Sequence, residues 1–480
     1  MNHSLQLSED NLLPSQIIDE ETEFKTSIEF TEIIDGDCLT RLYKKLTFGY
    51  TAQTIISIIS NILNIFLLSL PYIVHANGLC FGSIILVYVF ITSYFALCRI
   101  LDVLLKTNAL SFHQALYNYV SKNMAMFYNI IYVIYLFGKL LLYQYLTFTI
   151  VFRIVCNLFS IDVNTSKTSQ LIVFIVLFVV QIIISQISFI YTKRALFQLI
   201  TLFTCVVVFI VRVILMILNI IDASTPINND NDDDSSNDSN IWFKLNTNSF
   251  FSYAICVCIF CNVHNYIFPI YTYFELKSQK RIKDVLCKSQ TISIIAAFIF
   301  CVVIYLSLNV TYDNDEMIIL LNTPNDKRIL TLIFRVLFCI LILTYIATVL
   351  ENFRYVIRQT ITNSPHLTRQ QQQQQNGLSS LLVNIFVLGI STVIVGIMFE
   401  KERLFEMLVC LIGGICLGFL AFVFPSVLYG MVVDGNCIRK VIASVIMLVN
   451  GVLGIIVFIY GVIRFNTRSA PTDDNDDDSL

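Results

Sequence analysis

The sequence predicts an all-α polytopic membrane protein with eleven transmembrane helices. Of its 480 residues, 56% are hydrophobic and only 14% are charged, whereas a soluble domain carries about 25% charged residues. Eleven apolar stretches each supply the roughly 20 residues that a helix needs to cross a bilayer. Runs such as IIAAFIFCVVIYL do not alternate in polarity as the strands of a membrane barrel do. The spanning elements are therefore predicted to be helices.

The predicted spans form one membrane domain, residues 49–463. In order they cover residues 54–76, 79–105, 126–156, 170–190, 196–221, 250–274, 289–310, 329–350, 378–399, 404–430 and 440–463. Residues 1–48 are polar and acidic, which predicts a disordered cytosolic tail without a removable signal peptide. Residues 464–480 form an acidic tail on the other side of the membrane.

Basic residues predict the side on which each loop lies. With the amino terminus in the cytosol, the inner loops hold Lys106, Lys122, Lys193, Arg194, the run Lys277–Lys288, Arg354, Arg358, Arg369, Arg439 and Lys440. The opposite loops are acidic or neutral, in keeping with the positive-inside rule. Because the number of spans is odd, the carboxyl terminus is expected outside the cell or in a lumen. We expect an integral protein of the plasma membrane or of a lysosome- or vacuole-like compartment.

Glycosylation acceptor sequences agree with this orientation. Asn164 (NTS), Asn237 (NDS) and Asn309 (NVT) lie in, or at the edge of, loops assigned to the outer face, which predicts a glycoprotein. The Asp/Asn/Ser-rich tract 228–240 is predicted to be a disordered outer loop. The cytosolic loop 359–377 carries a glutamine run that indicates a low-complexity insertion without chemistry of its own.

Several functional classes find no support in the sequence. It contains no Walker loop, dinucleotide fingerprint, metalloprotease motif or convincing nucleophile–base set, so no enzyme is predicted. A formal net charge of −3 gives no basic surface for nucleic acid. Cys256, Cys258 and Cys261 form a C-x-C-x-x-C pattern inside an apolar stretch, which favours helix packing over a metal site. No cofactor is predicted, apart from a sodium ion or proton if transport is ion-coupled.

Polar residues interrupt two of the apolar stretches. They are Ser57, Ser60, Asn61, Asn64 and Ser69 before Pro71 in the first, and Asn262, His264 and Asn265 before Pro269 in the sixth. These stretches begin two successive sets of five helices, and interruptions at corresponding positions of two halves are typical of transporter substrate sites. A broken helix exposes amide groups that hold an anion and carbonyl groups that hold a cation.

This pattern predicts irregular backbone near 64–69 and near 262–265, with the two breaks facing each other. The alternative for each residue taken singly is an interhelical hydrogen bond with no role in binding, because Asn, Ser and Pro are tolerated in spanning helices.

Lys139 lies near the middle of the third predicted span, where an unpaired charge is costly. Residues three or four apart share a helix face, so Tyr135 and Tyr143 lie on its side. Gly138 beside it permits close approach of another helix. We expect Lys139 to face the interior, as a fixed cation that replaces a coupling ion or pairs with an anionic substrate. The alternative is a structural lysine in a hydrated vestibule or paired with a carbonyl.

Five segments in order resemble the amino acid/auxin permease family, in the style of the system A and N neutral amino acid transporters. They are SNILNIFLLSLPYIVHANG at 60–78, FGKLLLY at 137–143, HNYIFPIYTYFELKSQKRIKDV at 264–285, RVLFCILILTY at 335–345 and LIGGICLGFLAFVFPSVLY at 411–429. The resemblance implies a LeuT-like 5+5 inverted repeat plus one helix. It also implies alternating-access transport of amino acids, neutral or cationic, coupled to sodium or protons.

Candidate site residues follow from the interruptions and the resemblance together. For the substrate they are Asn61, Asn64, Ser69, Asn262, His264, Tyr143 and Lys139. For a sodium ion the resemblance implies a helix 1 Asn and a helix 8 Thr, here Asn61 and Thr344; counted back from Pro71, Ser60 takes the place of Asn61. The expected partners are an amino acid and the lipid bilayer, and the sequence identifies no protein partner.

The chain departs from the family where a Gly-x-Gly usually precedes the Leu-x-x-Pro region, since it reads Asn64-Ile65-Phe66 there. A phenylalanine in place of glycine reshapes the site for a substrate carboxylate, because only glycine permits the closest backbone approach. This departure favours the alternative function, a non-transporting amino acid sensor or binding protein of the same fold. A channel is a third and weaker alternative.

Overall fold

A computed structural model describes most of the membrane domain. The described residues are 50–107, 109, 111–159, 167–186, 191–217, 249–267, 279–308, 329–362, 377–399, 403–433 and 437–467. The chain divides into two units, Met1–Gln53 and Thr54–Leu480. The predicted tails, the tract 228–240, most of the loop 359–377 and the acceptors Asn164, Asn237 and Asn309 lie outside the described residues.

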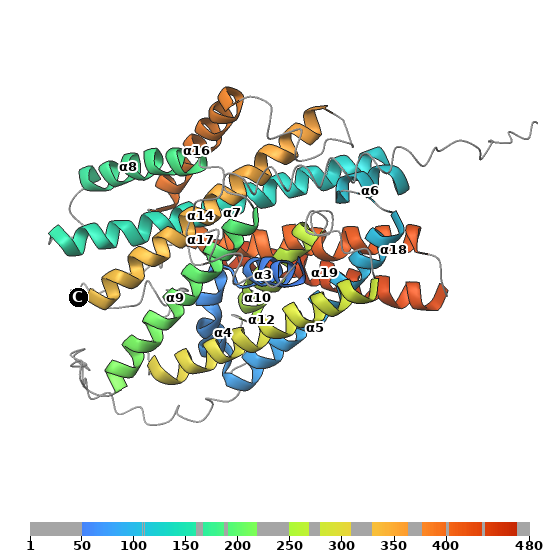
Figure 1. The fold of residues 1–480 in the computed structure, drawn as a ribbon, viewed down its shortest axis with the longest axis horizontal. Helices are drawn as coiled ribbons and strands as arrows, with labels where there is room; N and C mark the ends of the chain where they lie inside the picture. Colours follow the sequence, from blue (N-terminus) through green and yellow to red (C-terminus); the bar gives the residue numbers. More distant parts are fainter. Residues whose placement is uncertain are drawn as a thin grey trace, which may run out of the picture. The chain divides into compact units, whose positions relative to one another are not determined.

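Every regular element in the described residues is a helix (Figure 1). The first group is α3 (Tyr50–Ile62), η1 (Ile65–Ser69), α4 (Leu70–Asn77), α5 (Leu79–Thr107), α6 (Phe112–Tyr119), α7 (Lys122–Phe159), α8 (Lys167–Gln186) and α9 (Tyr191–Ile217). The second group is α10 (Ser249–Phe260), η2 (Asn262–Tyr266), α12 (Gln279–Leu308), α14 (Ile329–Thr362), α16 (Gly377–Phe399), α17 (Arg403–Cys410), η3 (Leu411–Cys416), η4 (Gly418–Val423), α18 (Phe424–Val432) and α19 (Cys437–Thr467).

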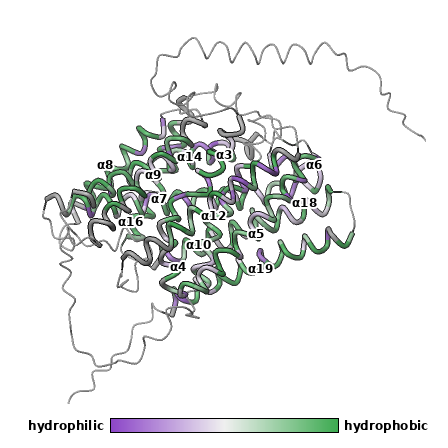
Figure 2. The backbone as a smooth tube through the Cα atoms, turned by 60° about the horizontal axis from the view of Figure 1, so that its bottom comes forward, coloured by the Kyte–Doolittle hydropathy of each residue, from purple (hydrophilic) through white to green (hydrophobic). Residues whose placement is uncertain are grey.

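Seven helices in the described part are long and apolar enough to cross a membrane. Apolar residues run along most of the helices in Figure 2. Large aliphatic side chains on the outer faces of α8, α16 and α19 are more than half exposed, including Ile183, Val393 and Val449. Such faces suit contact with lipid. The chain is therefore a polytopic helical membrane protein, as its composition predicts.

The helices extend beyond the apolar stretches that predict them. α12 begins at Gln279, so most of the basic run predicted as a loop is helical. α14 continues to Thr362, into the predicted loop 359–377, and α19 continues to Thr467, past residue 463. Hydropathy marks only the part of a helix inside the hydrocarbon core, whereas the hydrogen-bonded backbone continues into the polar region.

The short helix α6 was not predicted, although the sequence contains a capping motif at its start. Ser111 caps α6, and its hydroxyl accepts a hydrogen bond from the Gln114 amide at 3.1 Å. Ser111 followed three residues later by Gln114 is the spacing of a capping box. A hydropathy search overlooks this helix because it is not apolar enough to span a membrane.

The helical segment at the tenth predicted span, residues 404–430, contains unusual turns. Its central segments η3 and η4 are π-helical, between the α-helical turns of α17 and α18. π-Helical turns are rare and are often found near functional sites. η3 packs against α10, α7 and α19, so its wider turns lie between the sixth, third and eleventh predicted spans.

Glycines permit the backbones of these helices to touch. A Cβ atom on Gly414 would lie 2.5 Å from the carbonyl oxygen of Gly454 in α19, and one on Gly413 would collide with the carbonyl oxygen of Ala254 in α10. A Cβ on Gly138 of α7 would meet Ile412 of η3 at 3.0 Å, which confirms the expected close approach beside Lys139. Small residues of this kind are what allow membrane helices to pack closely.

The Gly414→Ala variant tests this packing. Because the added methyl group meets backbone rather than a flexible side chain, it should destabilise the protein by about 1–3 kcal/mol and lower its unfolding temperature. Gly389→Ala in α16 is the matched control, since a Cβ there meets nothing within 4 Å. Equal unfolding temperatures for the two purified variants in detergent would contradict the close packing of η3 on α19.

Candidate functional site

The first predicted break is present. α3 ends at Ile62, the short 3₁₀-helix η1 begins at Ile65, and α4 starts at Leu70 with Pro71 in its first turn. Asn64 stands between the helices with extended backbone, and its side-chain oxygen accepts a hydrogen bond from the Phe66 amide at 2.9 Å. The Asn64 side chain thus satisfies a backbone donor that the broken helix leaves without a partner.

The second predicted break is also present. α10 ends at Phe260, and a 3₁₀-helix, η2, follows from Asn262 to Tyr266. The buried ring of His264 has Nδ1 3.0 Å from the carbonyl oxygen of Cys261 and Nε2 3.2 Å from that of Ser93 in α5. His264 therefore links the second break to α5.

Two asparagines join the breaks to each other. Asn64 Nδ2 donates to the carbonyl oxygen of Cys258 in α10 at 3.0 Å. In the opposite direction, Asn262 Nδ2 donates to the carbonyl oxygen of Asn61 in α3 at 2.6 Å. Both side chains are fully buried, with 0% and 1% exposure. The prediction that the two interruptions face each other is confirmed.

Lys139 of α7 lies beside this junction, with 3% of its surface exposed. Its Nζ atom donates to Asn262 Oδ1 at 2.7 Å and lies 3.5 Å from the Tyr135 hydroxyl. The same atom lies 5.6, 5.5 and 5.9 Å from the ring centres of Tyr135, Tyr143 and Tyr266. Aromatic faces attract a cation at these distances. The predicted interior position of Lys139 is confirmed.

Two predicted site residues offer buried hydroxyls without a protein partner. Ser69 and Tyr143 are both 0% exposed, and neither hydroxyl makes a hydrogen bond in the described part of the chain. A buried hydroxyl without a partner costs free energy. These two hydroxyls therefore differ from the hydrogen-bonded polar groups around them.

The predicted ion-coupling side chains are hydrogen-bonded within their own helices. Ser60 Oγ and Asn61 Nδ2 donate to the carbonyl oxygen of Ser57, at 3.0 and 2.7 Å. Thr344 Oγ1 donates to the carbonyl oxygen of Leu341 in α14 at 2.7 Å.

Sequence reasoning overlooked Tyr345, the neighbour of Thr344. Its hydroxyl lies 3.1 Å from the carbonyl oxygen of Ser60 and 3.3 Å from that of Leu63, where α3 ends. A tyrosine inside an apolar stretch resembles ordinary core, so only its proximity to the break shows that Tyr345 binds the free end of α3.

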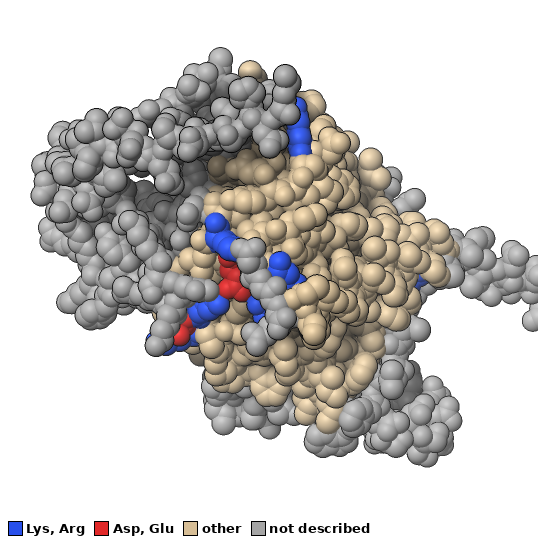
Figure 3. Space-filling view, turned by 90° about the vertical axis from the view of Figure 1, so that its right-hand side faces the viewer, with Lys and Arg blue, Asp and Glu red and all other residues tan. Residues whose placement is uncertain are grey.

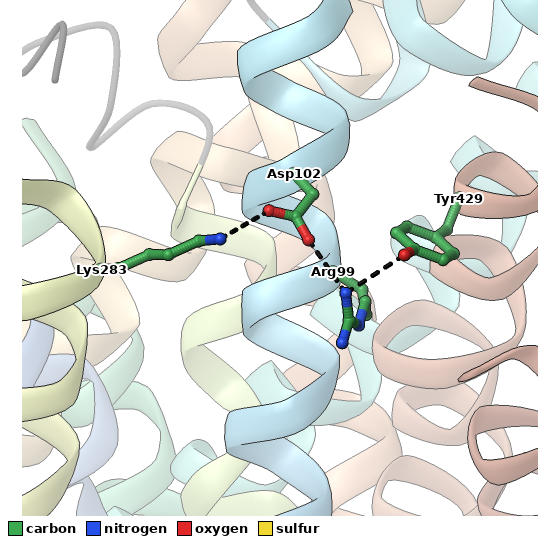
Figure 4. Close-up of polar contacts among 4 residues, drawn as sticks. All are labelled: Arg99, Asp102, Lys283 and Tyr429. Carbon is green, nitrogen blue, oxygen red and sulfur yellow. Dashed lines mark hydrogen bonds and ion pairs between the residues drawn. The ribbon is translucent and has the colours of Figure 1, made fainter. Parts of the chain in front are cut away.

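A charged cluster joins three helices near the C-terminal end of α5 (Figure 4). Asp102 pairs with Arg99 at 3.1 Å, as its i, i+3 spacing predicts, and with Lys283 of α12 at 2.9 Å. Arg99 also donates to the Tyr429 hydroxyl of α18 at 3.1 Å. Figure 3 shows most of the charged side chains of one face gathered in one place, with a separate basic side chain near the upper edge. Asp102 therefore holds together α5 and α12, which are far apart in the sequence.

Metal binding finds no support in the described residues. No group of three or more His, Cys, Asp or Glu side chains there is arranged to hold a metal ion. Cys256, Cys258 and Cys261 are buried in α10 and at its end, in line with the packing role predicted for them.

Two interrupted helices joined at a buried polar junction, inside a bundle of spanning helices, define the architecture of a membrane transporter. The chain matches the family model for transmembrane amino acid transporter proteins over residues 49–464. This range covers most of the chain, and the protein belongs to that family. The family consists of transporters, which confirms that the chain is not an enzyme. No curated protein matches the chain.

The Asn64→Ala variant tests the junction. It removes the partner of a buried carbonyl at Cys258 and of the Phe66 amide, each worth about 1–3 kcal/mol when left unsatisfied. The unfolding temperature should fall. Asn123→Ala at the exposed start of α7 is the control, which should unfold like the parent protein. The junction would lose its assigned importance if Asn64→Ala also unfolded at the parent temperature.

The Asp102→Asn variant tests the charged cluster. It leaves two cations, Arg99 and Lys283, without the carboxylate that they share, so the helices around it should separate more often. Alkylation of the partly buried Cys98, one turn earlier in α5, should speed up by at most about fivefold, as expected for a partly exposed pair. Cys80 at the other end of α5 provides an internal control, read by mass spectrometry of labelled peptides. Unchanged labelling at Cys98 would contradict the role of Asp102 in holding α5 and α12 together.

Proposed function

We propose that the protein is a secondary active transporter that moves amino acids across a membrane by alternating access. The observation that carries the proposal is the pair of interrupted helices, linked in both directions by Asn64 and Asn262. Membership of the transmembrane amino acid transporter family supports an amino acid as the solute. Broken helices supply amide and carbonyl groups at membrane depth, which suit the carboxylate and ammonium groups of an amino acid.

In this proposal the fold has eleven spans with a LeuT-like inverted repeat of five plus five. The helices that precede and follow each interruption would correspond in the two halves, with η1 in one and η2 in the other. Alternating access then requires the cluster around Asp102 to open and close, because it ties α5 to α12 and, through Arg99, to α18. The basic helix ends favour the cytosol for this side of the protein.

The substrate site in this proposal combines the residues around the junction. Lys139 and the Tyr143 hydroxyl supply a charge and a donor for a carboxylate. Ser69 supplies a second free hydroxyl at the first break. Asn61, Asn64, Asn262 and His264 hold the backbone in shape and are displaced or reoriented if the breaks open.

Coupling to sodium or to protons completes the proposal. Sodium would need the side-chain oxygen of Ser60 or Asn61 together with that of Thr344. The Ser60 and Thr344 hydroxyls and the Asn61 amide nitrogen donate hydrogen bonds within their own helices. Proton coupling would need none of these contacts to change. Uptake measured with and without sodium in Thr344→Ala and Asn61→Ala separates the two, since only sodium coupling loses an ion ligand in these variants.

The test of the function uses the purified full-length chain in two forms. In detergent, an amino acid that binds the folded protein raises its unfolding temperature. In liposomes, the same amino acid should accumulate when a sodium or proton gradient is imposed and should not when the gradient is dissipated. Stabilisation without any flux would instead identify a binding protein or sensor, and the absence of both would reject the proposal.

The Tyr143→Phe variant provides a sharper prediction. The Tyr143 hydroxyl is buried without a partner in the described part of the chain, so its loss should leave the unfolding temperature of the ligand-free protein unchanged or raise it. Amino acid affinity should fall about tenfold if that hydroxyl donates to the substrate. Tyr345→Phe provides the comparison. The Tyr345 hydroxyl hydrogen-bonds to two backbone carbonyls, so this variant should unfold at a lower temperature than the parent protein. Unchanged affinity in Tyr143→Phe would remove Tyr143 from the site.

A further inference from the structure

The buried charges of the described residues share one sign. Lys139 and Arg335 are the charged side chains buried in this part of the chain, with 3% and 2% exposure, and no Asp or Glu there is buried. The acidic members of the described ion pairs are Asp102 and Glu406, whose side chains keep 16% and 21% exposure. Of the two buried cations, Lys139 is the one that lies beside the junction, where it contacts Asn262.

Among the described residues, every group that contacts the Lys139 ammonium is neutral. Asn262 offers an amide oxygen at 2.7 Å, and Tyr135 offers a hydroxyl at 3.5 Å. Three tyrosine rings surround the ammonium at 5.5–5.9 Å. Amide oxygens and aromatic faces lower the cost of burying a cation, but neither cancels its charge.

An amino acid of zero net charge would leave that positive charge uncompensated. Its carboxylate and ammonium groups enter together and cancel each other's charge. A cationic side chain would add a second positive charge where the low dielectric strengthens repulsion. An acidic side chain would bring the missing negative charge to within reach of Lys139 and of the free Tyr143 hydroxyl.

We propose that the site takes amino acids with one net negative charge, and that Lys139 is the counter-ion of their acidic side chain. This inference rests on the proposed function and names its substrate class. It departs from the expectation of a neutral or cationic substrate. Specificity then has an attractive part, the new ion pair, and a repulsive part, the exclusion of cationic amino acids by the same lysine.

Glutamate and glutamine provide the comparison, because they have nearly the same shape and differ in charge. The purified full-length chain is titrated with glutamate, glutamine and lysine at constant pH and ionic strength, and the concentration for half-maximal thermal stabilisation is measured. We expect this concentration to be at least about tenfold lower for glutamate than for glutamine, as for a buried charge pair, and highest for lysine.

Two variants connect the preference to the lysine. Lys139→Met removes the charge and should reduce the glutamate preference to about parity. Asn262→Asp places a fixed carboxylate next to Nζ, where the amide oxygen lies at 2.7 Å, and should reduce the preference even if Lys139→Met does not fold. Lys122→Met, at the exposed start of the same helix, is the control and should retain the parent preference.

The outcomes separate this inference from the function on which it rests. Tighter binding of glutamine than glutamate by the parent protein, or a glutamate preference that survives in the folded variants, would overturn the inference and leave amino acid transport standing. The absence of stabilisation and of gradient-driven uptake for every amino acid would overturn the proposed function, and this inference with it.

Discussion

The hydrogen bonds of the Asn262 side chain are the constraint on which the rest of the site depends. Its amide nitrogen donates to the Asn61 carbonyl at the end of α3, while its oxygen accepts from Lys139 and Tyr135. An amide oxygen has two lone pairs, and these two donors use both. One side chain therefore fixes a backbone end, a buried cation and a tyrosine at once. Loss of any one contact would leave a buried group that the bilayer cannot satisfy.

The free backbone groups at the breaks receive hydrogen bonds from several helices. The Tyr345 hydroxyl of α14 lies within hydrogen-bond distance of the carbonyl oxygens of Ser60 and Leu63. The Ser93 hydroxyl of α5 donates to the carbonyl oxygen of Phe260 at 3.0 Å. The breaks are thus stable only while α5, α7 and α14 stay in place around them. A movement of these helices must change the hydrogen bonds of the breaks as well. This physical link is what a transporter requires to join substrate binding to the opening of one side.

The sequence was most informative where polar residues interrupt apolar stretches. Asn64, Asn262 and Lys139 could be assigned to the interior because a bilayer offers no other partners for them. Tyr345 could not, because a tyrosine is common in apolar cores and its function depends on which carbonyl it meets. The polar extension of α12 was also missed, and with it the pairing of Lys283 with Asp102, since hydropathy carries no information about helices outside the hydrocarbon core. The π-helical turns of η3 and η4 have no signal in a periodicity of 3.6 residues.

The net charge of the whole chain and the charge of its described interior have opposite signs. The whole chain has a formal charge of −3, and twenty of its 34 acidic residues lie in the tracts 1–48, 228–240 and 464–480. The described core has instead two buried cations and no buried acid. Because a charge is far more costly in a low dielectric than at a surface, Lys139 would dominate the potential that a substrate meets in the proposed site. In the proposed site, selectivity would therefore depend on Lys139 and its tyrosine neighbours rather than on the acidic sequence as a whole.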